Sequence, residues 1–495
     1  MTQAREHTKV IAIKSLFWRF MEMFGRYGLQ FLLQIIMARI LAPSDYGAYT
    51  IAIAMVTVAS SYIAGLPQAL IQDEGATEKD WAVVMWFLLG VTTIVYIIFF
   101  VAADQIASFY NKLEIALYLQ AIMLALYFAV YQEMQATRLI RKMQFKQLFT
   151  RSLVATIGSG LIGVCAALLG LGTWALILQY ISSYIIGCVI LFLRNPWFPK
   201  PRISWVTLKK YFRFSVKVFC SSLLKNNFDS IGDMILGRYL TSTQMGYIDR
   251  GRKFGQSAST IIDNPIQTVF FSLLSRINGA GENMLSTVRI VVSTYSCLVV
   301  PFFSILVLFS EQVIVFLFGS QWTEASFYFA IYCITYIPMA LTTISFQAFN
   351  AMGRSGIPLV CGLSRLIIGL FAIGVAMHLN ADAQTTVAFW CIWSALGTLV
   401  VMIPNALILK YKLNQQIHDF LLPCIFGGAL IILPFKLENH FVSIVNPFIT
   451  LGMVALGLLA FLLMCVITKQ KSCSFLYGIM ISKRGKNKNG DYRVG

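Results

Sequence analysis

The sequence predicts an all-α polytopic membrane protein of about 14 transmembrane helices, arranged as two pseudo-symmetric six-helix lobes and a C-terminal helix pair. Of its 495 residues, 58% are hydrophobic and only 12% are charged, whereas a soluble protein carries about 25% charged residues. Apolar stretches of about 20 residues recur along the chain, which is the length that a helix needs to cross a bilayer. The strands of a membrane barrel would instead alternate over about 10 residues. The chain also resembles itself at an offset of 199 residues.

The expected membrane helices follow one another with short connections. Length and hydropathy place them at about 13–38, 47–71, 81–103, 113–136, 150–170, 173–193, 212–237, 245–275, 287–310, 323–348, 357–379, 384–409, 420–436 and 445–468. The fourth, seventh and eighth stretches contain charged side chains and are the least regular. The longest inner connection, at about 194–211, is basic and rich in proline, and the outer connections are all short. No soluble domain is therefore expected on either side.

The distribution of Lys and Arg orients the chain in the membrane. If the N-terminus is cytoplasmic, 27 of the 39 cations fall on the cytoplasmic side, 4 on the opposite side and 8 within predicted helices. Since cytoplasmic loops carry the positive excess, both termini are expected in the cytoplasm. Most of the net charge of +18 therefore has this cause, and nucleic acid is not expected as a partner.

The N-terminus and the cysteines set further expectations. The opening MTQAREHTKVIAIKSLFWRF lacks the short apolar region and small-residue cleavage site of a signal peptide, so the first helix is expected to remain in the mature chain. The ten cysteines include no CxxC pair, and the four histidines are far apart. A cysteine in an apolar stretch behaves as a small hydrophobe. Structural disulfides, a metal site and a cofactor are therefore not expected.

Two segments 199 residues apart share one pattern: MARILAPSDYGAY at 37–49 aligns with LGRYLTSTQMGYI at 236–248. The alignment pairs Arg39 with Arg238, Leu41 with Leu240, and Gly47 with Gly246. Transporters are often built from such repeats, with the substrate site at their interface. The predicted organisation is an N-terminal lobe at 1–200, a C-terminal lobe at 201–412, a terminal helix pair at 413–470 and a basic cytoplasmic tail at 471–495.

Eight cations lie inside stretches that are predicted to span the membrane. A cation in hydrocarbon costs about 2.5–3.5 kcal/mol on insertion scales, so such side chains are expected to face a protein interior or a wet cavity. A cavity with fixed positive charge suits an anionic cargo. The candidates for binding an anionic head group are Arg19, Arg26, Lys217, Lys225 and Arg365. The cations expected at the outer mouth of the cavity are Arg250, Arg252 and Lys253.

The same charges also admit a purely structural interpretation. Two sets of charged residues each share one helical face: Arg19, Glu22 and Arg26 in the first span, and Lys225, Asp229 and Asp233 in the seventh. Six acidic residues fall in or near the spans, which leaves a surplus of only +2. Glu22, Asp229 and Asp233 are therefore candidates either for ion coupling or for ion pairs that join helices. Arg26 and Lys225 are the strongest ligand candidates, because the repeat places them symmetrically.

The opening of the chain resembles a known family. The segment QIIMARILAPSDYGAYTIAIA at 34–54, followed by GLPQALIQ at 65–72 and later by NAMG at 350–353, is similar to the polysaccharide exporters of the multidrug/oligosaccharidyl-lipid/polysaccharide (MOP) superfamily. The resemblance implies a Wzx-type flippase of the bacterial inner (plasma) membrane, close to the exporters of colanic and teichuronic acid units. Such proteins move undecaprenyl-pyrophosphate-linked oligosaccharide between leaflets by alternating access. The motif marks a turn and carries over no functional residue.

The resemblance also implies partners and leaves alternatives open. The expected partners are a lipid-linked oligosaccharide of an O-antigen, capsule or exopolysaccharide, membrane lipids, and the polymerase and glycosyltransferases of the same pathway. Polar and aromatic residues expected to meet sugars are Trp18, Tyr27, Gln30, Gln34, Asn226 and Asn227. The same-fold alternatives are a lipid II flippase and a multidrug/cation antiporter, although the latter favours an acidic lumen. A membrane enzyme of polysaccharide assembly would be expected to show a large outer loop, so an enzyme is not expected.

Overall fold

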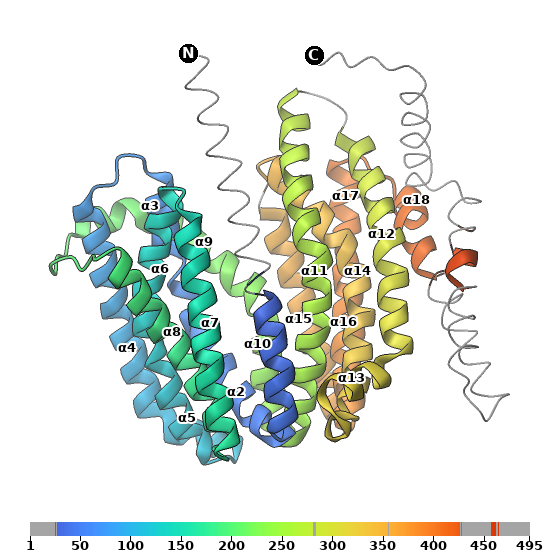
Figure 1. Cartoon of the computed structure of the whole chain (residues 1–495). Helices are drawn as coiled ribbons and strands as arrows, with labels where there is room; N and C mark the ends of the chain where they lie inside the picture. The colour runs from blue at the N-terminus through green and yellow to red at the C-terminus, as the bar shows by residue number, and fades with distance from the viewer. Residues whose placement is uncertain are drawn as a thin grey trace, which may run out of the picture. The chain divides into compact units, whose positions relative to one another are not determined.

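A computed structural model describes residues 25, 27–280, 284–354, 356–425, 427, 457–461 and 464. Within the helices at 205–226 and 242–280, several side chains lie outside this description, among them those of Lys217 and Lys225. The described residues are almost entirely helical and include no β-strand (Figure 1). The predicted all-α class is therefore confirmed.

The chain forms two compact units, the first of which comprises residues up to Asp249 together with Val315–Trp322. Its described elements are a helix at Tyr27–Ile40, α2 (Pro43–Ala59), η1 (Ser60–Tyr62), α3 (Gly65–Gln72), α4 (Glu78–Tyr110), α5 (Glu114–Met123), α6 (Ala125–Arg141), α7 (Phe145–Leu168), α8 (Thr173–Arg194), α9 (Trp205–Asn226), α10 (Phe228–Tyr239) and the first turns of α11 (Ser242–Ala280). α9 packs against α3, and α10 packs against α2. The sequence places α9 and α10 in the second lobe, so the two-lobe organisation stays a prediction.

The second unit comprises Arg250–Ile314 and the chain from Thr323 onward. Its described elements are the rest of α11, α12 (Met284–Leu308), most of α13 (Ser310–Phe318), α14 (Ala325–Ala351), α15 (Gly356–His378), α16 (Ala383–Thr398), η3 (Leu399–Val401), α17 (Met402–Ile408), α18 (Leu413–Gln416) and the π-helix η4 (Ile417–Leu421). The short η2 (Ser320–Trp322) belongs to the first unit. Within the second unit, α15 packs on α16, and α12 packs on α14.

Nine helices in the described part of the chain are long and apolar enough to cross a membrane. They are Pro43–Gln72, Glu78–Tyr110, Glu114–Arg141, Phe145–Leu168, Thr173–Arg194, Met284–Leu308, Ala325–Ala351, Gly356–His378 and Ala383–Ile408. These nine match nine predicted spans in order. The seventh and eighth predicted spans correspond to the more polar α9, α10 and α11, and the last two lie mostly outside the described residues. The total of about 14 therefore stays a prediction.

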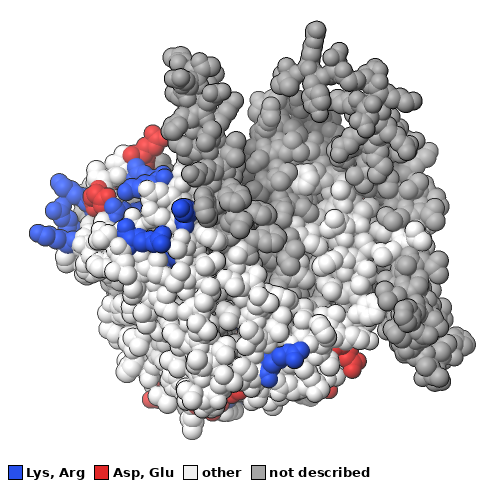
Figure 2. All heavy atoms as spheres, viewed as in Figure 1, with Lys and Arg blue, Asp and Glu red and all other residues white. Residues whose placement is uncertain are grey.

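Charged side chains lie near the two ends of the first unit. Figure 2 shows Lys and Arg gathered at one end, over the connections beside α3, α6 and α9, and a nearly uncharged surface between the two ends. Exposed apolar side chains such as Ile94, Ile98 and Val101 cover this band on α4. An uncharged band between charged ends is the surface that a bilayer requires. The protein is therefore a multi-pass membrane protein.

Side-chain caps set where several helices begin. At the start of α4, the backbone N–H of Thr77 donates to Asp80 Oδ2 at 2.9 Å, while Thr77 Oγ1 accepts from the N–H of Asp80. At the start of α16, Asp382 Oδ1 accepts from the N–H of Thr385. Such caps satisfy N–H groups that have no partner inside the helix. α4 ends at Tyr110, and the left-handed φ of 53° at the following Asn111 stops the helix.

Glycines allow the close approach of α7 and α8. A Cβ added at Gly158 would lie 2.9 Å from Cδ1 of Ile186, and one added at Gly163 would lie 2.9 Å from Cβ of Gln179. Small residues at such points let helix backbones approach closely, and the resulting van der Waals packing favours helix association in lipid. The glycine content of these apolar helices therefore serves packing.

The two repeated turns pack directly on each other within the first unit. A Cβ added at Gly47 would overlap the carbonyl oxygen of Ser242, and one added at Gly246 would overlap the carbonyl oxygen of Pro43. Ser242 follows Pro43 by the same 199 residues that separate Gly246 from Gly47. Equivalent residues therefore make reciprocal contacts, as in a two-fold symmetric interface.

The same correspondence extends to the first residues of α2 and α11. The N–H of Ala42 donates to Asp45 Oδ2, and the N–H of Thr241 donates to Gln244 Oε1, both at 3.0 Å. Each donor and each acceptor is related to its counterpart by the offset of 199 residues. The structure thus confirms the repeat at the level of individual hydrogen bonds.

Candidate functional site

The structure describes only part of the predicted cation set. Arg19, Glu22 and Arg26 lie outside the described residues, and the side chains of Lys217 and Lys225 do as well. Their predicted role in binding an anionic head group stays a prediction.

The predicted seventh span is broken beside Lys225. α9 ends at Asn226 and α10 begins at Phe228, and the intervening Asn227 has non-helical backbone angles of −111° and 8°. The side chain of Asn227 is buried, and its Nδ2 donates to Ser61 Oγ at 2.8 Å. A break of this kind leaves backbone polar groups outside the helical hydrogen-bond pattern, which membrane helices tolerate only inside protein or beside a cavity.

The second predicted span is interrupted at the same contact. η1, which contains Ser61, separates α2 from α3. Next to it, the hydroxyls of Tyr62 and Thr92 lie 2.6 Å apart. The bond between Asn227 and Ser61 thus joins these two spans, and the contact between Tyr62 and Thr92 adds α4. The sequence predicts Asn227 as a sugar contact and does not single out Ser61, although both lie in polar pairs (SS at 60–61, NN at 226–227) within apolar stretches.

α10 carries the two predicted acidic residues. Asp233 is buried, and Asp229 is partly exposed. They lie one turn apart on one face of the helix, as the sequence predicts. Ion coupling and helix-joining ion pairs both stay predictions for these two residues.

The three cations of α11 lie near its beginning. Arg250 and Arg252 are buried, and Lys253 is partly exposed. Between the two arginines, Gly251 approaches α14 so closely that an added Cβ would lie 2.7 Å from the backbone nitrogen of Phe329. The expected place of these cations at an outer mouth stays a prediction.

Arg365 joins α15 to α16. Its Nε donates to Ser394 Oγ at 2.9 Å, and the buried Ser394 lies on α16. An added Cβ on Gly397 would lie 3.0 Å from Cα of Arg365, so the two helices are close at this point. This hydrogen bond fits the structural interpretation of Arg365, in which the side chain holds two helices together.

A polar cluster joins the end of α3 to the start of α9. Asp73 Oδ2 accepts from Lys210 Nζ at 2.5 Å and from the Tyr211 hydroxyl at 2.6 Å. These hydrogen bonds, with the one from Lys210 the strongest, lower the pKa of Asp73 to about 2. The same bond raises the pKa of Lys210. Further along the two helices, a Cβ added at Gly65 would lie 2.7 Å from the carbonyl oxygen of Ser215.

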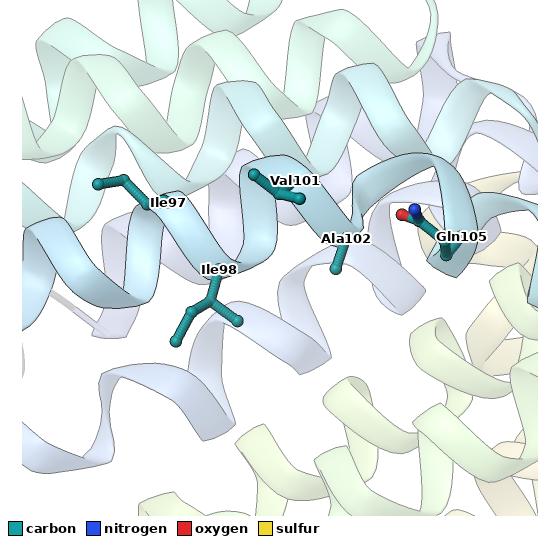
Figure 3. A pocket seen from close by; sticks show the side chains of 5 residues that line it. All are labelled: Ile97, Ile98, Val101, Ala102 and Gln105. Carbon is teal, nitrogen blue, oxygen red and sulfur yellow. The ribbon is translucent and has the colours of Figure 1, made fainter.

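α4 carries a shallow hollow on its exposed face. Figure 3 shows its lining residues, Ile97, Ile98, Val101, Ala102 and Gln105, and the hollow has a volume of about 450 Å³. All five come from one helix, and four of them are apolar. The hollow lies within the uncharged band of the first unit, so hydrocarbon chains of lipid are its expected surroundings.

Comparisons with known proteins match this fold and sequence. A family model described as polysaccharide biosynthesis protein matches residues 36–327, more than half of the chain. The succinoglycan biosynthesis transport protein ExoT of Rhizobium meliloti (strain 1021) is 24% identical over 311 residues, covering 62% of this chain. That match spans 63% of ExoT, less than two thirds of its length.

A second relative covers more of the chain. The teichuronic acid biosynthesis protein TuaB of Bacillus subtilis (strain 168) is 20% identical over 418 residues, which are 81% of this chain and 84% of TuaB. Among solved structures, the lipid II flippase MurJ in an inward closed conformation matches with a TM-score of 0.70 and 14% identity. The match covers 95% of this chain and 99% of that structure. The likeness shows a shared fold.

Proposed function

Because this chain belongs to the polysaccharide biosynthesis protein family, we propose that it is a flippase that moves undecaprenyl-pyrophosphate-linked oligosaccharide units across the bacterial inner membrane by alternating access. The observation that carries the proposal is the family match across residues 36–327. ExoT and TuaB, whose names refer to succinoglycan transport and teichuronic acid synthesis, support a polysaccharide cargo. The fold shared with MurJ supports a lipid-linked one.

The proposed cargo site lies around the break between α9 and α10. Transporters commonly bind cargo where membrane helices are discontinuous, and Lys225 lies two residues before Asn227. The cargo pyrophosphate carries about two negative charges, which Arg grips through paired N–H groups and Lys attracts as a point charge. In this proposal Arg19, Arg26, Lys217 and Lys225 bind the pyrophosphate. Arg365 contributes less, because its Nε is committed to Ser394.

A double substitution tests the cavity cations. Arg26→Ala with Lys225→Ala should reduce surface polysaccharide at least about tenfold, because each lost charged hydrogen bond costs about 1.5–3 kcal/mol. The protein should remain in the membrane at its normal level, and lipid-linked units should accumulate inside the cell. Surface polysaccharide and membrane-bound protein are measured in the same cells.

A matched control removes the same charge elsewhere. Arg202→Ala with Lys209→Ala removes one Arg and one Lys from exposed positions near the start of α9, and export should stay close to normal. Normal export in the cavity double mutant would overturn the assignment of these cations.

A lipid II flippase is the second candidate, because MurJ shares the fold. Complementation separates the two functions. The proposed function predicts that the chain restores polysaccharide export in an exporter-deficient strain and does not replace an essential lipid II flippase. Rescue of peptidoglycan synthesis alone would favour the second candidate. Uptake assays with cationic drugs address the antiporter alternative in the same strains.

A further inference from the structure

The repeated turns are held together by crossed helix caps. Lys112, in the connection after α4, donates from Nζ to the carbonyl oxygens of Gly237 and Leu240 at 3.2 and 3.0 Å. These carbonyls lie at the C-terminal end of α10, where the helix leaves its last C=O groups without partners. A cation there also interacts favourably with the negative end of the helix dipole.

An equivalent cap occurs on the other copy of the repeat. Gln321, in η2 after α13, donates from Nε2 to the carbonyl oxygens of Ala38 and Leu41 at 3.0 and 3.4 Å. Ala38 and Leu41 precede Gly237 and Leu240 by 199 residues each. The two caps therefore end on the same two positions of the repeat. Lys112 lies just after α4, the third span of its copy, whereas Gln321 follows α12, the third span of the other copy, after the short intervening α13.

The paired arginines extend the crossed arrangement. Arg39 donates from Nε to the carbonyl of Leu317 at 2.8 Å and from Nη2 to the carbonyl of Phe316 at 2.5 Å. Its counterpart Arg238 lies over the ring of Phe109, with Cζ 5.2 Å from the ring centre. Trp322 Nε1 adds a bond to the Ala38 carbonyl at 2.7 Å. Arg39 thus reaches α13, the short helix that follows α12. Arg238 reaches the end of α4.

We propose that the two reciprocal glycine contacts and the two crossed caps form a two-fold latch that holds this end of the transporter closed. The latch consists of residues 38–47 and 237–246 with Lys112 and Gln321. Moving the copies apart uncaps both helix ends at once, so the latch opens cooperatively rather than one side at a time. The inference rests on the proposed function, because a latch of this kind matters only in a chain that alternates between closed and open ends.

Glycine substitutions test the latch by wedging it open. Gly47→Ala and Gly246→Ala each place a methyl group against a backbone carbonyl, which cannot rotate away. In lipid nanodiscs without cargo, either variant should speed amide hydrogen exchange at least about fivefold in both segments, 43–50 and 242–250. Gly90→Ala is the matched control, since nothing lies within 4 Å of a Cβ added there on α4, and its exchange should equal that of the unmodified protein.

Removal of the caps gives a second test that adds no steric clash. Lys112→Ala and Gln321→Ala should each speed exchange in both segments, and the double variant should exchange faster than either. Lys112→Gln supplies the same donor group as Gln321 and should restore most of the protection. Unchanged exchange in both the glycine and the cap variants, or faster exchange confined to the substituted turn, would overturn the latch.

The exchange measurement is separate from the cargo. If the latch variants open but the cells export no polysaccharide even with the unmodified protein, the proposed function fails while the latch stands. If export depends on the chain and the latch variants behave like the unmodified protein in exchange, the latch fails while the function stands.

Discussion

Asp73 shows how a single partly exposed group can join two helices. It lies at the C-terminal end of α3 and accepts hydrogen bonds from Lys210, from Tyr211 and from the backbone N–H of Gly75. These bonds favour the charged carboxylate, which is why its pKa falls to about 2. The bond between Asp73 and Lys210 is therefore lost in the acid range, where Asp73 is protonated, and in the strongly alkaline range, where Lys210 loses its proton.

The pH dependence of this contact has a definite sign. A carboxyl with a lowered pKa stabilises the joined state above its ordinary pKa of about 3.9, and that contribution disappears as pH falls from about 4 to about 2. Carbon-13 NMR of labelled Asp carboxyls in nanodiscs, assigned by comparison with Asp73→Asn, should show a titration midpoint near 2. In Lys210→Ala the midpoint should rise towards the ordinary value, and an equal midpoint in both proteins would contradict the assignment of the shift.

At the scale of elements, an ion pair fastens the π-helix η4 to α12. Asp419 in η4 is completely buried and accepts from Arg289 Nε at 2.5 Å and Nη2 at 3.0 Å, and from the Tyr411 hydroxyl at 3.0 Å. His418 Nδ1 lies 3.2 Å from Oδ1 of Asp419, the oxygen that also accepts from Arg289 Nη2. π-helical turns are rare and are often found at functional sites. The predicted terminal helix pair begins at this joint.

Substitutions at this joint separate the pair from its surroundings. Arg289→Ala leaves the buried carboxylate without its cation, which costs about 3–5 kcal/mol in comparable sites and should lower the thermal midpoint in detergent by several degrees. The double variant Arg289→Met with Asp419→Leu should be closer to the unmodified protein, since no charge stays buried alone. An Arg289→Ala midpoint equal to that of the unmodified protein would show that the pair contributes nothing.

Other element-scale features depend on contacts that hydropathy does not reveal. The break after α9 is joined to the interruption of the second span by the bond between Asn227 and Ser61. A sliding hydropathy window averages composition over a length of chain, so it does not detect a local bend. The predicted spans therefore have the right order, while two of them contain interruptions that were not predicted.

At the scale of the whole molecule, nine predicted spans correspond to apolar helices of the described residues. Individual contacts bear out the repeat at its two turns. Composition and periodicity sufficed for these features because both are properties of the chain itself. The contacts of individual side chains are harder to predict from the sequence. In the sequence, Lys112 is simply one of the four cations expected on the outer side. In the structure it caps α10. The sequence could not show this, because a cap depends on which segments the fold brings together.

Orientation is the whole-molecule prediction that remains to be measured. With 27 cations on one side and 4 on the other, both termini should be cytoplasmic. Alkaline phosphatase fused after Lys112 should be active, and a fusion at residue 495 should be inactive, while a fluorescent protein at residue 495 should fold and emit. The reverse pattern would place the latch on the cytoplasmic side.

The reciprocal packing of the repeated turns has an evolutionary consequence. Gly47 packs against the backbone of Ser242, and Gly246 packs against the backbone of Pro43. Each copy of the repeat therefore supplies both a glycine and the backbone segment that the other glycine contacts. Neither turn can therefore change at these positions without affecting the other. A bulkier residue in one turn has to be answered by a backbone shift in the other, and related sequences should therefore vary at the two turns together.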